Sequence, residues 1–200
     1  MNKTAVEQED ESRLWERFCK GNKEAFDSLY YTYFPLLFQY CSKFTADRDL
    51  IKDVLQDFFI ELFTQSSRRG NIRQLKSYLF VSARRKLLKT LRQQKVRSTL
   101  NLEEEDAYDF HLELSADHPL IHKQQDSHLQ LVVQQVINQL SNRQREAVYL
   151  YFFENIGYDG IADIMSMKEV KYARTLIYRA LAEMREAFAG NQQLSGLLES

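Results

Sequence analysis

The sequence predicts an all-α protein of two small helical domains joined by an acidic linker, the C-terminal domain being a helix-turn-helix. Apolar residues recur at three- and four-residue intervals over most of the 200 residues. Only 6 Gly and 2 Pro interrupt them, so long helices are expected. An acidic segment without sustained period divides the periodic regions. We therefore expect a first domain at 1–96, a linker at 97–128, a second domain at 129–190 and a tail at 191–200.

Helical periodicity defines the elements of the first domain. Asn22 is the expected N-cap of one helix, and Pro35 should kink or restart that helix. A second helix is expected at about 47–64 and a third at about 74–95, with a loop by composition at 66–71. The apolar stripe of the second helix is formed by Ile51, Val54, Leu55, Phe58 and Leu62.

The second domain opens with an apolar pattern from Leu129. Ser141-Asn-Arg-Gln144 fits a capping box that begins the next helix, and Gly157 is expected to end that unit. Tyr158-Asp-Gly-Ile-Ala-Asp-Ile-Met165, a turn and a long helix follow. Two helices around a tight turn indicate a helix-turn-helix, although an ordinary helical hairpin would show the same pattern.

Charge is strongly segregated despite an overall net charge of −1. Residues 1–67 carry −4, residues 98–128 carry −7 and residues 129–200 carry −1, whereas residues 68–97 carry +11 and hold no acid. A solvated helix face normally mixes both signs, so this block favours contact with a polyanion such as nucleic acid. Lysine and arginine would bind phosphates, and polar or aromatic residues would read unpaired bases. The candidates are Arg69, Asn71, Arg73, Lys76, Ser77, Tyr78, Arg84, Arg85 and Lys89.

The last long helix carries a second set of candidate DNA contacts. Ala162 is small, as the first helix of a helix-turn-helix requires where the second helix crosses it. Side chains of the second helix would then reach base edges and phosphates in a major groove. These candidates are Lys168, Lys171, Tyr172, Arg174, Thr175, Tyr178 and Arg179.

The second helix of the first domain has an acidic-amide face made of Asp53, Gln56, Asp57 and Glu61. Asp53 and Asp57 have the i, i+4 spacing of a metal pair, but no suitable third ligand lies near them and Lys52 is adjacent. An exposed face of this kind is better interpreted as a protein-docking surface.

A series of short motifs follows one another along the chain. They are Ala25-Phe-Asp-Ser-Leu-Tyr30, Tyr33-Phe-Pro35, Asp53-Val-Leu-Gln-Asp-Phe-Phe-Ile-Glu-Leu-Phe63, Ser77-Tyr-Leu-Phe80, Leu140-Ser-Asn-Arg-Gln-Arg-Glu146, Tyr158-Asp-Gly-Ile-Ala-Asp-Ile-Met165 and Tyr178-Arg-Ala-Leu181. In this order they resemble the extracytoplasmic-function (ECF) subfamily of sigma-70-type RNA polymerase sigma factors, and the resemblance covers about residues 12–95 and 129–188. The chain departs from the family pattern by one extra residue between Met165 and Tyr178, by Ser166 in place of a turn glycine, and by Arg85 in place of asparagine.

The resemblance implies a role for each part of the chain. The acidic-amide face would dock on the clamp helices of the largest subunit of core RNA polymerase. The 66–73 loop and the 74–92 helix would open the −10 element of promoter DNA, and the C-terminal helix would read the −35 element as duplex. The linker would run toward the active-site cleft, and an anti-sigma factor is an implied further partner.

Other functional classes fit the sequence less well. It holds no P-loop and no nucleophile–base set, so neither an enzyme nor a cofactor is predicted. His118 and His122 have the spacing of a helical zinc pair, but Pro119 lies between them and no metal site is expected. No apolar run could cross a membrane and no signal peptide is evident, so a cytoplasmic protein is expected. A stand-alone helix-turn-helix regulator and a helical adaptor that binds no DNA are the alternatives.

Overall fold

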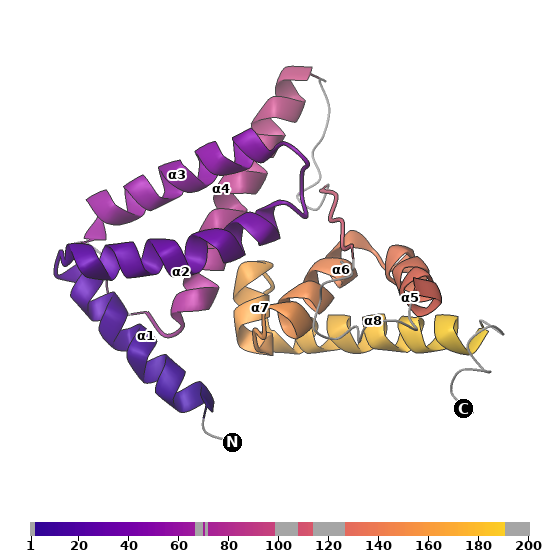
Figure 1. The fold of residues 1–200 in the computed structure, drawn as a ribbon. Coiled ribbons are helices and arrows are strands. Elements are labelled where there is room, and N and C mark those ends of the chain that lie inside the picture. Colours follow the sequence, from indigo (N-terminus) through magenta and orange to yellow (C-terminus); the bar gives the residue numbers. More distant parts are fainter. Residues whose placement is uncertain (1–2, 67–69, 71, 99–107, 114–126, 191–200) are drawn as a thin grey trace. The chain divides into compact units, whose positions relative to one another are not determined.

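The computed structural model describes residues 3–66, 70, 72–98, 108–113 and 127–190 (Figure 1). Over these residues the chain is helical and has no strand, and it divides into two compact units with a boundary between Tyr108 and Asp109. The predicted all-α class is therefore confirmed. Among the described helices, none has the length and apolarity needed to cross a lipid bilayer.

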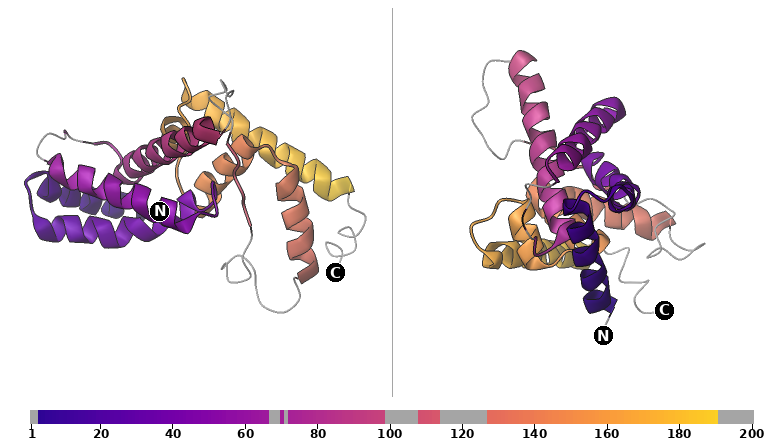
Figure 2. Two further views of the ribbon diagram at one scale, coloured as in Figure 1. Left: turned by 90° about the horizontal axis from the view of Figure 1, so that it is seen from above. Right: turned by 90° about the vertical axis from the view of Figure 1, so that its left-hand side faces the viewer.

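The first unit is built from α1 (Lys3–Cys19), α2 (Lys23–Cys41), α3 (Arg48–Thr64) and α4 (Leu75–Ser98). Helix α2 packs against each of the other three, and Figures 1 and 2 show α2 and α3 side by side. Helix α1 was not among the predicted elements. The most deeply buried large side chains of this unit are Trp15, Phe18, Leu29, Leu37, Tyr40, Ile51, Leu55, Phe59, Leu62 and Phe80.

Side-chain caps explain where α2 and α3 begin. The Asn22 side-chain oxygen accepts a hydrogen bond of 2.7 Å from the backbone N–H of Ala25, as predicted. Asp47 likewise accepts one of 3.0 Å from the N–H of Leu50. Each cap satisfies an amide that the first turn of a helix leaves without a partner.

Helix α2 continues through Pro35, so of the two predicted outcomes, a kink or a restart of the helix, the restart is wrong. Proline has no N–H to donate to the carbonyl of Tyr31, and in a buried position that carbonyl would lose its partner. Here Pro35 is exposed and the Tyr31 side chain is 77% exposed, so this face of the helix lies in solvent. Water can therefore satisfy the carbonyl, and packing of the opposite face holds the helix together.

Replacing this proline should stabilise the first unit. Pro35→Ala restores the backbone N–H and removes the clash of the proline ring, which stabilises the folded helix. Alanine also gives the unfolded chain more conformational freedom, but this opposing effect is smaller. We expect a gain of about 1–2 kcal/mol in the free energy of unfolding, measured by urea denaturation. Pro35→Gly restores the same N–H with poorer helix propensity and should gain less. A loss of stability in Pro35→Ala would contradict this explanation.

The second unit contains α5 (Ser127–Gln139), α6 (Asn142–Val148), a π-helical turn η2 (Tyr149–Phe153), α7 (Tyr158–Ile164) and α8 (Val170–Gly190). Helix α8 packs against both α5 and α6. The predicted capping box is present: Ser141 Oγ accepts from the Gln144 N–H at 3.3 Å, and Gln144 Oε1 accepts from the Ser141 N–H at 2.8 Å. The Gln144 amide also donates to Glu183 of α8 at 2.7 Å, which joins the start of α6 to the long helix.

Two turns of this region use left-handed backbone at residues other than glycine. Asn155 has a φ of 52° and Ser166 has a φ of 54°, whereas Gly157, expected to end the preceding unit, does not have a positive φ. Asparagine tolerates this conformation, because its short polar side chain can hydrogen-bond locally. Serine tolerates it less well. Ser166 is therefore the strained position of the α7–α8 turn.

We expect Ser166→Gly to raise the free energy of unfolding of the protein by about 0.5–1 kcal/mol. Left-handed backbone destabilises the folded state by about 1–2 kcal/mol at an L-residue, and glycine removes this strain. Part of the resulting gain is lost because glycine gives the unfolded chain more conformational freedom. Thermal unfolding measures the difference. Asn155→Gly is the matched comparison and should gain less, since asparagine is already tolerated there. Equal or no gain at the two positions would contradict the assignment of strain to Ser166.

Residues 108–113 show a regularity that the sequence analysis missed. In this part of the linker the side chains alternate between buried and exposed, which is a period of two where no period was expected. The buried members are Tyr108, Phe110 and Leu112, and the exposed members are Asp109, His111 and Glu113.

The last part of this segment is held within the second unit. The Phe110 ring meets the Tyr149 ring edge-on at 5.9 Å, and the Phe110 N–H donates to the side-chain oxygen of Asn142 at 3.1 Å. The Leu112 carbonyl accepts a bond of 2.8 Å from the Gln134 amide. The segment thus bridges α5 and the start of α6, and these two backbone groups are paired with side chains instead of a neighbouring strand.

Candidate nucleic-acid and polymerase interface

The predicted docking face on α3 is exposed along its whole length. Asp53, Gln56, Asp57 and Glu61 all lie on the solvent side of the helix, opposite the buried stripe, as the helical period predicts. Ile60 projects from the same face and is 61% exposed. An exposed apolar side chain surrounded by polar groups resembles the apolar centre and polar rim of a protein-binding surface.

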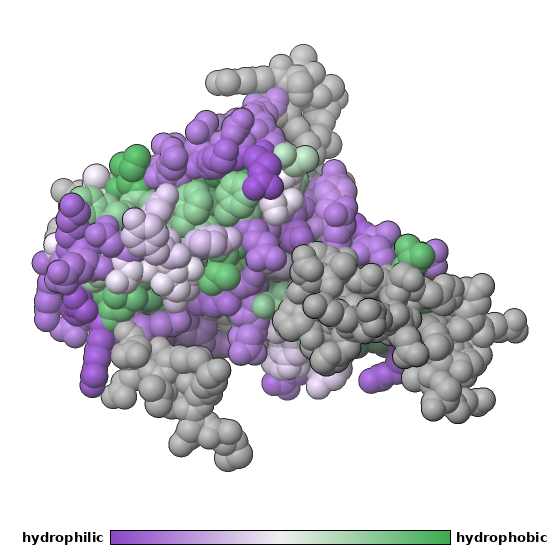
Figure 3. All heavy atoms as spheres, viewed as in Figure 1, coloured by the Kyte–Doolittle hydropathy of each residue, from purple (hydrophilic) through white to green (hydrophobic). Residues whose placement is uncertain are grey.

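An aromatic ladder supports this face from behind. Phe26, Tyr30, Phe34 and Phe38 follow one another at i, i+4 along α2, with neighbouring ring centroids 5.0–6.3 Å apart. Phe59 of α3 packs on three of them. In Figure 3, patches of apolar colour accordingly lie over α2 and α3 among hydrophilic residues. The ladder fixes the rotation of α3 about its axis, and so determines which residues face solvent.

Glu61 connects this face to the basic helix. Its carboxylate forms an ion pair of 2.5 Å with the ammonium of Lys86 on α4. Lys86 is largely covered, its side chain being 22% exposed, so the pair is better shielded from water than an ordinary surface pair. Helices α3 and α4 are thus held together by an ion pair as well as by packing.

The basic block is divided between exposed and covered cations. Arg73, Arg85 and Lys89 are exposed, and Lys76 is half-buried with its ammonium 5.6 Å from the centre of the Phe80 ring. Three of the predicted −10 residues therefore expose their positive charge to solvent. Exposed cations suit contacts with DNA phosphates, because long lysine and arginine side chains can place their charged groups along the DNA backbone.

Two other predicted −10 residues are buried in this structure. Ser77 is 6% exposed and donates to Gln74 at 2.9 Å. Arg84 is 8% exposed, and its guanidinium lies 5.2 Å from the centre of the Tyr108 ring. Tyr108 comes from the linker, so the residue that covers Arg84 is remote in sequence. The predicted residues Arg69 and Asn71 lie outside the described part of the chain.

Trp15 of α1 anchors the chain just before α4. Its indole Nε1–H donates to the carbonyl oxygen of Gly70 at 3.1 Å, and its ring meets the Tyr78 ring edge-on at 5.4 Å. Trp15 is 2% exposed whereas Gly70 is exposed, so the bond lies at the edge of the core. No local pattern could have revealed this contact, because the two residues are 55 positions apart.

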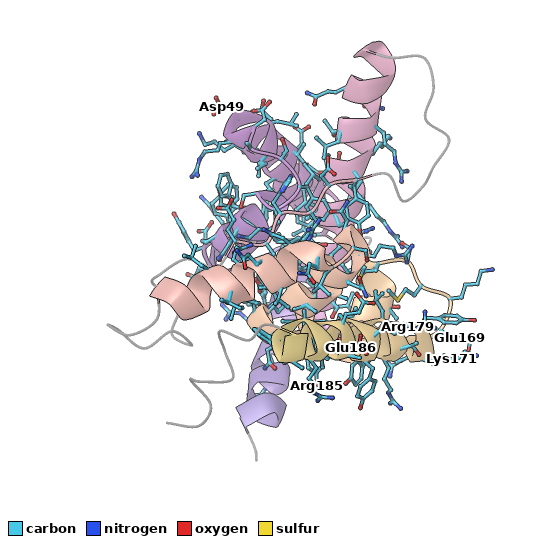
Figure 4. The ribbon with its side chains drawn as sticks, turned by 90° about the vertical axis from the view of Figure 1, so that its right-hand side faces the viewer. Asp49, Glu169, Lys171, Arg179, Arg185 and Glu186 are labelled. Carbon is cyan, nitrogen blue, oxygen red and sulfur yellow. The ribbon has the colours of Figure 1, made fainter. Side chains whose placement is uncertain are left out.

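The candidate −35 residues lie along the exposed face of α8 and the turn before it. Lys168, Lys171, Tyr172, Arg174, Thr175, Tyr178 and Arg179 are all exposed. The opposite face is buried through Ala173, Ile177 and Ala180. Figure 4 shows Lys171 and Arg179 projecting outward from the helix. Glu169 pairs with Lys171 at 2.9 Å and offsets part of the positive charge at the start of the helix.

No group of three or more potential metal ligands occurs within the described residues. The histidine pair considered in the sequence, His118 and His122, lies outside them.

Two segments of the chain match descriptions of known protein families. Residues 29–97 match the family description "Sigma-70 region 2", and residues 130–184 match "Sigma-70, region 4". No curated protein sequence matches the chain.

Two solved structures resemble the whole fold. One is CnrH in complex with the cytosolic domain of CnrY, at 18% identity and a TM-score of 0.56, covering 91% of this chain and 99% of the other. The second is the sigma factor RpoE of Bartonella quintana in complex with the anti-sigma factor NepR, at 20% identity and a TM-score of 0.54, covering 84% and 98%.

Proposed function

Because this chain belongs to the sigma-70 family and carries regions 2 and 4 in order, we propose that it is an ECF-type sigma factor that binds core RNA polymerase. The observation that carries this proposal is the exposed α3 face around Ile60, with its carboxylates held outward by the aromatic ladder. An ordinary DNA-binding regulator has no need of such a face.

The exposed residues support a division of labour between the two units. In the first unit, α3 would dock on the polymerase, and the cations Arg73, Arg85 and Lys89 would hold the opened −10 strand. In the second unit, the exposed face of α8 would enter the major groove of the −35 element. The linker would run toward the polymerase cleft. An anti-sigma partner is part of the proposal, by likeness to the two complexes named above.

A run-off transcription assay tests the proposal. Core polymerase from a bacterium is incubated with a promoter library, with and without this chain. We expect transcripts from a small subset of promoters only when the chain is present. The alternative, a stand-alone helix-turn-helix regulator, predicts tight binding to duplex DNA without polymerase and no new transcripts. That outcome would overturn the proposal.

A further inference from the structure

Three tyrosines from different elements of the second unit gather beside Arg174. The rings of Tyr151 on η2 and Tyr158 on α7 are stacked, with centroids 5.1 Å apart and planes 16° from parallel. The Arg174 guanidinium of α8 lies 5.4 Å from the centre of the Tyr158 ring. A hydrogen bond with Tyr151, together with partial burial and the nearness of Tyr178, raises the pKa of Tyr158 to about 12. The Tyr158 ring is thus in contact with both the Tyr151 ring and the Arg174 guanidinium.

This arrangement leaves the edge of the guanidinium available. The contact with the ring is a cation–π interaction, which depends on the charge of the guanidinium and requires no N–H···O hydrogen bond. The N–H donors lie in the plane of the guanidinium. Arg174 is exposed, so these donors are open to solvent. The planar fork is the geometry that binds O6 and N7 of guanine with two parallel hydrogen bonds in the major groove. Binding restricts the rotamers of a long arginine side chain, and this loss of conformational entropy weakens binding. Contact with the Tyr158 ring already restricts Arg174 before it binds DNA, so less entropy is lost on binding.

Resting on the function proposed above, we propose that Tyr158, backed by Tyr151, is a positioning residue that holds Arg174 ready to read a guanine in the −35 element. Neither tyrosine needs to touch DNA for this role. The ring is the essential part and the hydroxyl is secondary.

The test is the base preference of the reconstituted holoenzyme on promoters randomised in the −35 element and constant elsewhere. Arg174→Ala should relax the preference for guanine at one position by about tenfold or more, which identifies the position. Tyr158→Leu and Tyr158→Met remove the ring and should each lower the preference there by about two- to fivefold. Tyr158→Phe keeps the ring and should retain the preference. In the Arg174→Ala background, Tyr158→Leu should change nothing further.

Other results would overturn the positioning role of Tyr158. If both ring-removing variants keep the wild-type preference, or if Tyr158→Leu has the same effect without Arg174, the positioning role is overturned while the sigma-factor function stands. An equal fall in transcription on every promoter, with base preference unchanged, would show a purely structural role and also overturn it. If wild-type protein directs no transcription with core polymerase, the proposed function itself fails and the inference falls with it.

Discussion

Reversing the charges of Asp53 and Asp57 to lysine should abolish binding of core RNA polymerase, with an affinity loss of at least about 100-fold. Both carboxylates are exposed on α3, and neither makes an ion pair with the residues that the structure describes. Their charge is therefore available to a partner, and two like charges placed against its basic surface would repel it. Binding of labelled protein to core polymerase, measured by fluorescence polarisation, gives the affinity.

The fold should survive this double substitution, because exposed helix positions outside caps tolerate change within about 0.5 kcal/mol. Glu16→Lys combined with Glu24→Lys is the matched control. It changes the net charge equally within the same unit, at two exposed sites on α1 and α2. Polymerase affinity should remain within a few-fold of wild type in this control. Equal loss in both variants would show that net charge, and not the α3 face, governs binding.

Removing Arg73, Arg85 and Lys89 together should weaken binding of the holoenzyme to pre-opened promoter DNA by about 100-fold at 0.1 M salt. Each phosphate contact on a single strand contributes about 0.7 to the slope of log affinity against log salt concentration, so three contribute about 2. The triple glutamine variant should therefore show a shallower salt dependence by about that amount. Titration of a labelled template with an unpaired −10 region, at several salt concentrations, measures both quantities.

Three exposed lysines elsewhere in the first unit provide the comparison. Lys20, Lys23 and Lys52 lie on or beside α1, α2 and α3, and their replacement by glutamine removes the same charge. This variant should leave the salt slope nearly unchanged. If its slope falls as far as that of the α4 variant, then long-range attraction and not phosphate contact explains the affinity.

Features determined by neighbouring residues could be predicted from the sequence. The caps at Asn22 and Ser141 connect residues three apart, so the pattern contains both partners of each bond. The solvent side of α3 and of α8 followed from helical period, because the apolar stripe leaves only one face for polar residues. These parts of the candidate site were correctly expected to be exposed.

Features that depend on distant residues could not be predicted. Ser77 and Arg84 resemble other polar members of α4 in the sequence, yet both are buried, and Tyr108 from the linker lies over the Arg84 guanidinium. The contact between Tyr158 and Arg174 likewise joins two helices through packing. Helix α2 passes through Pro35 because packing of the opposite face holds the helix and solvent lies on the proline side.

The bond between Trp15 and Gly70 gives the protein a built-in spectroscopic probe. Trp15 is the only tryptophan in the chain. Isotope-labelled protein should therefore give a single indole ¹⁵N–¹H resonance, and its chemical shift reports whether the Gly70 carbonyl is still hydrogen-bonded. Fluorescence excited at the red edge of indole absorption would likewise come from this one site despite the 11 tyrosines. Changes around the start of α4 can thus be followed in the wild-type molecule without attaching a label.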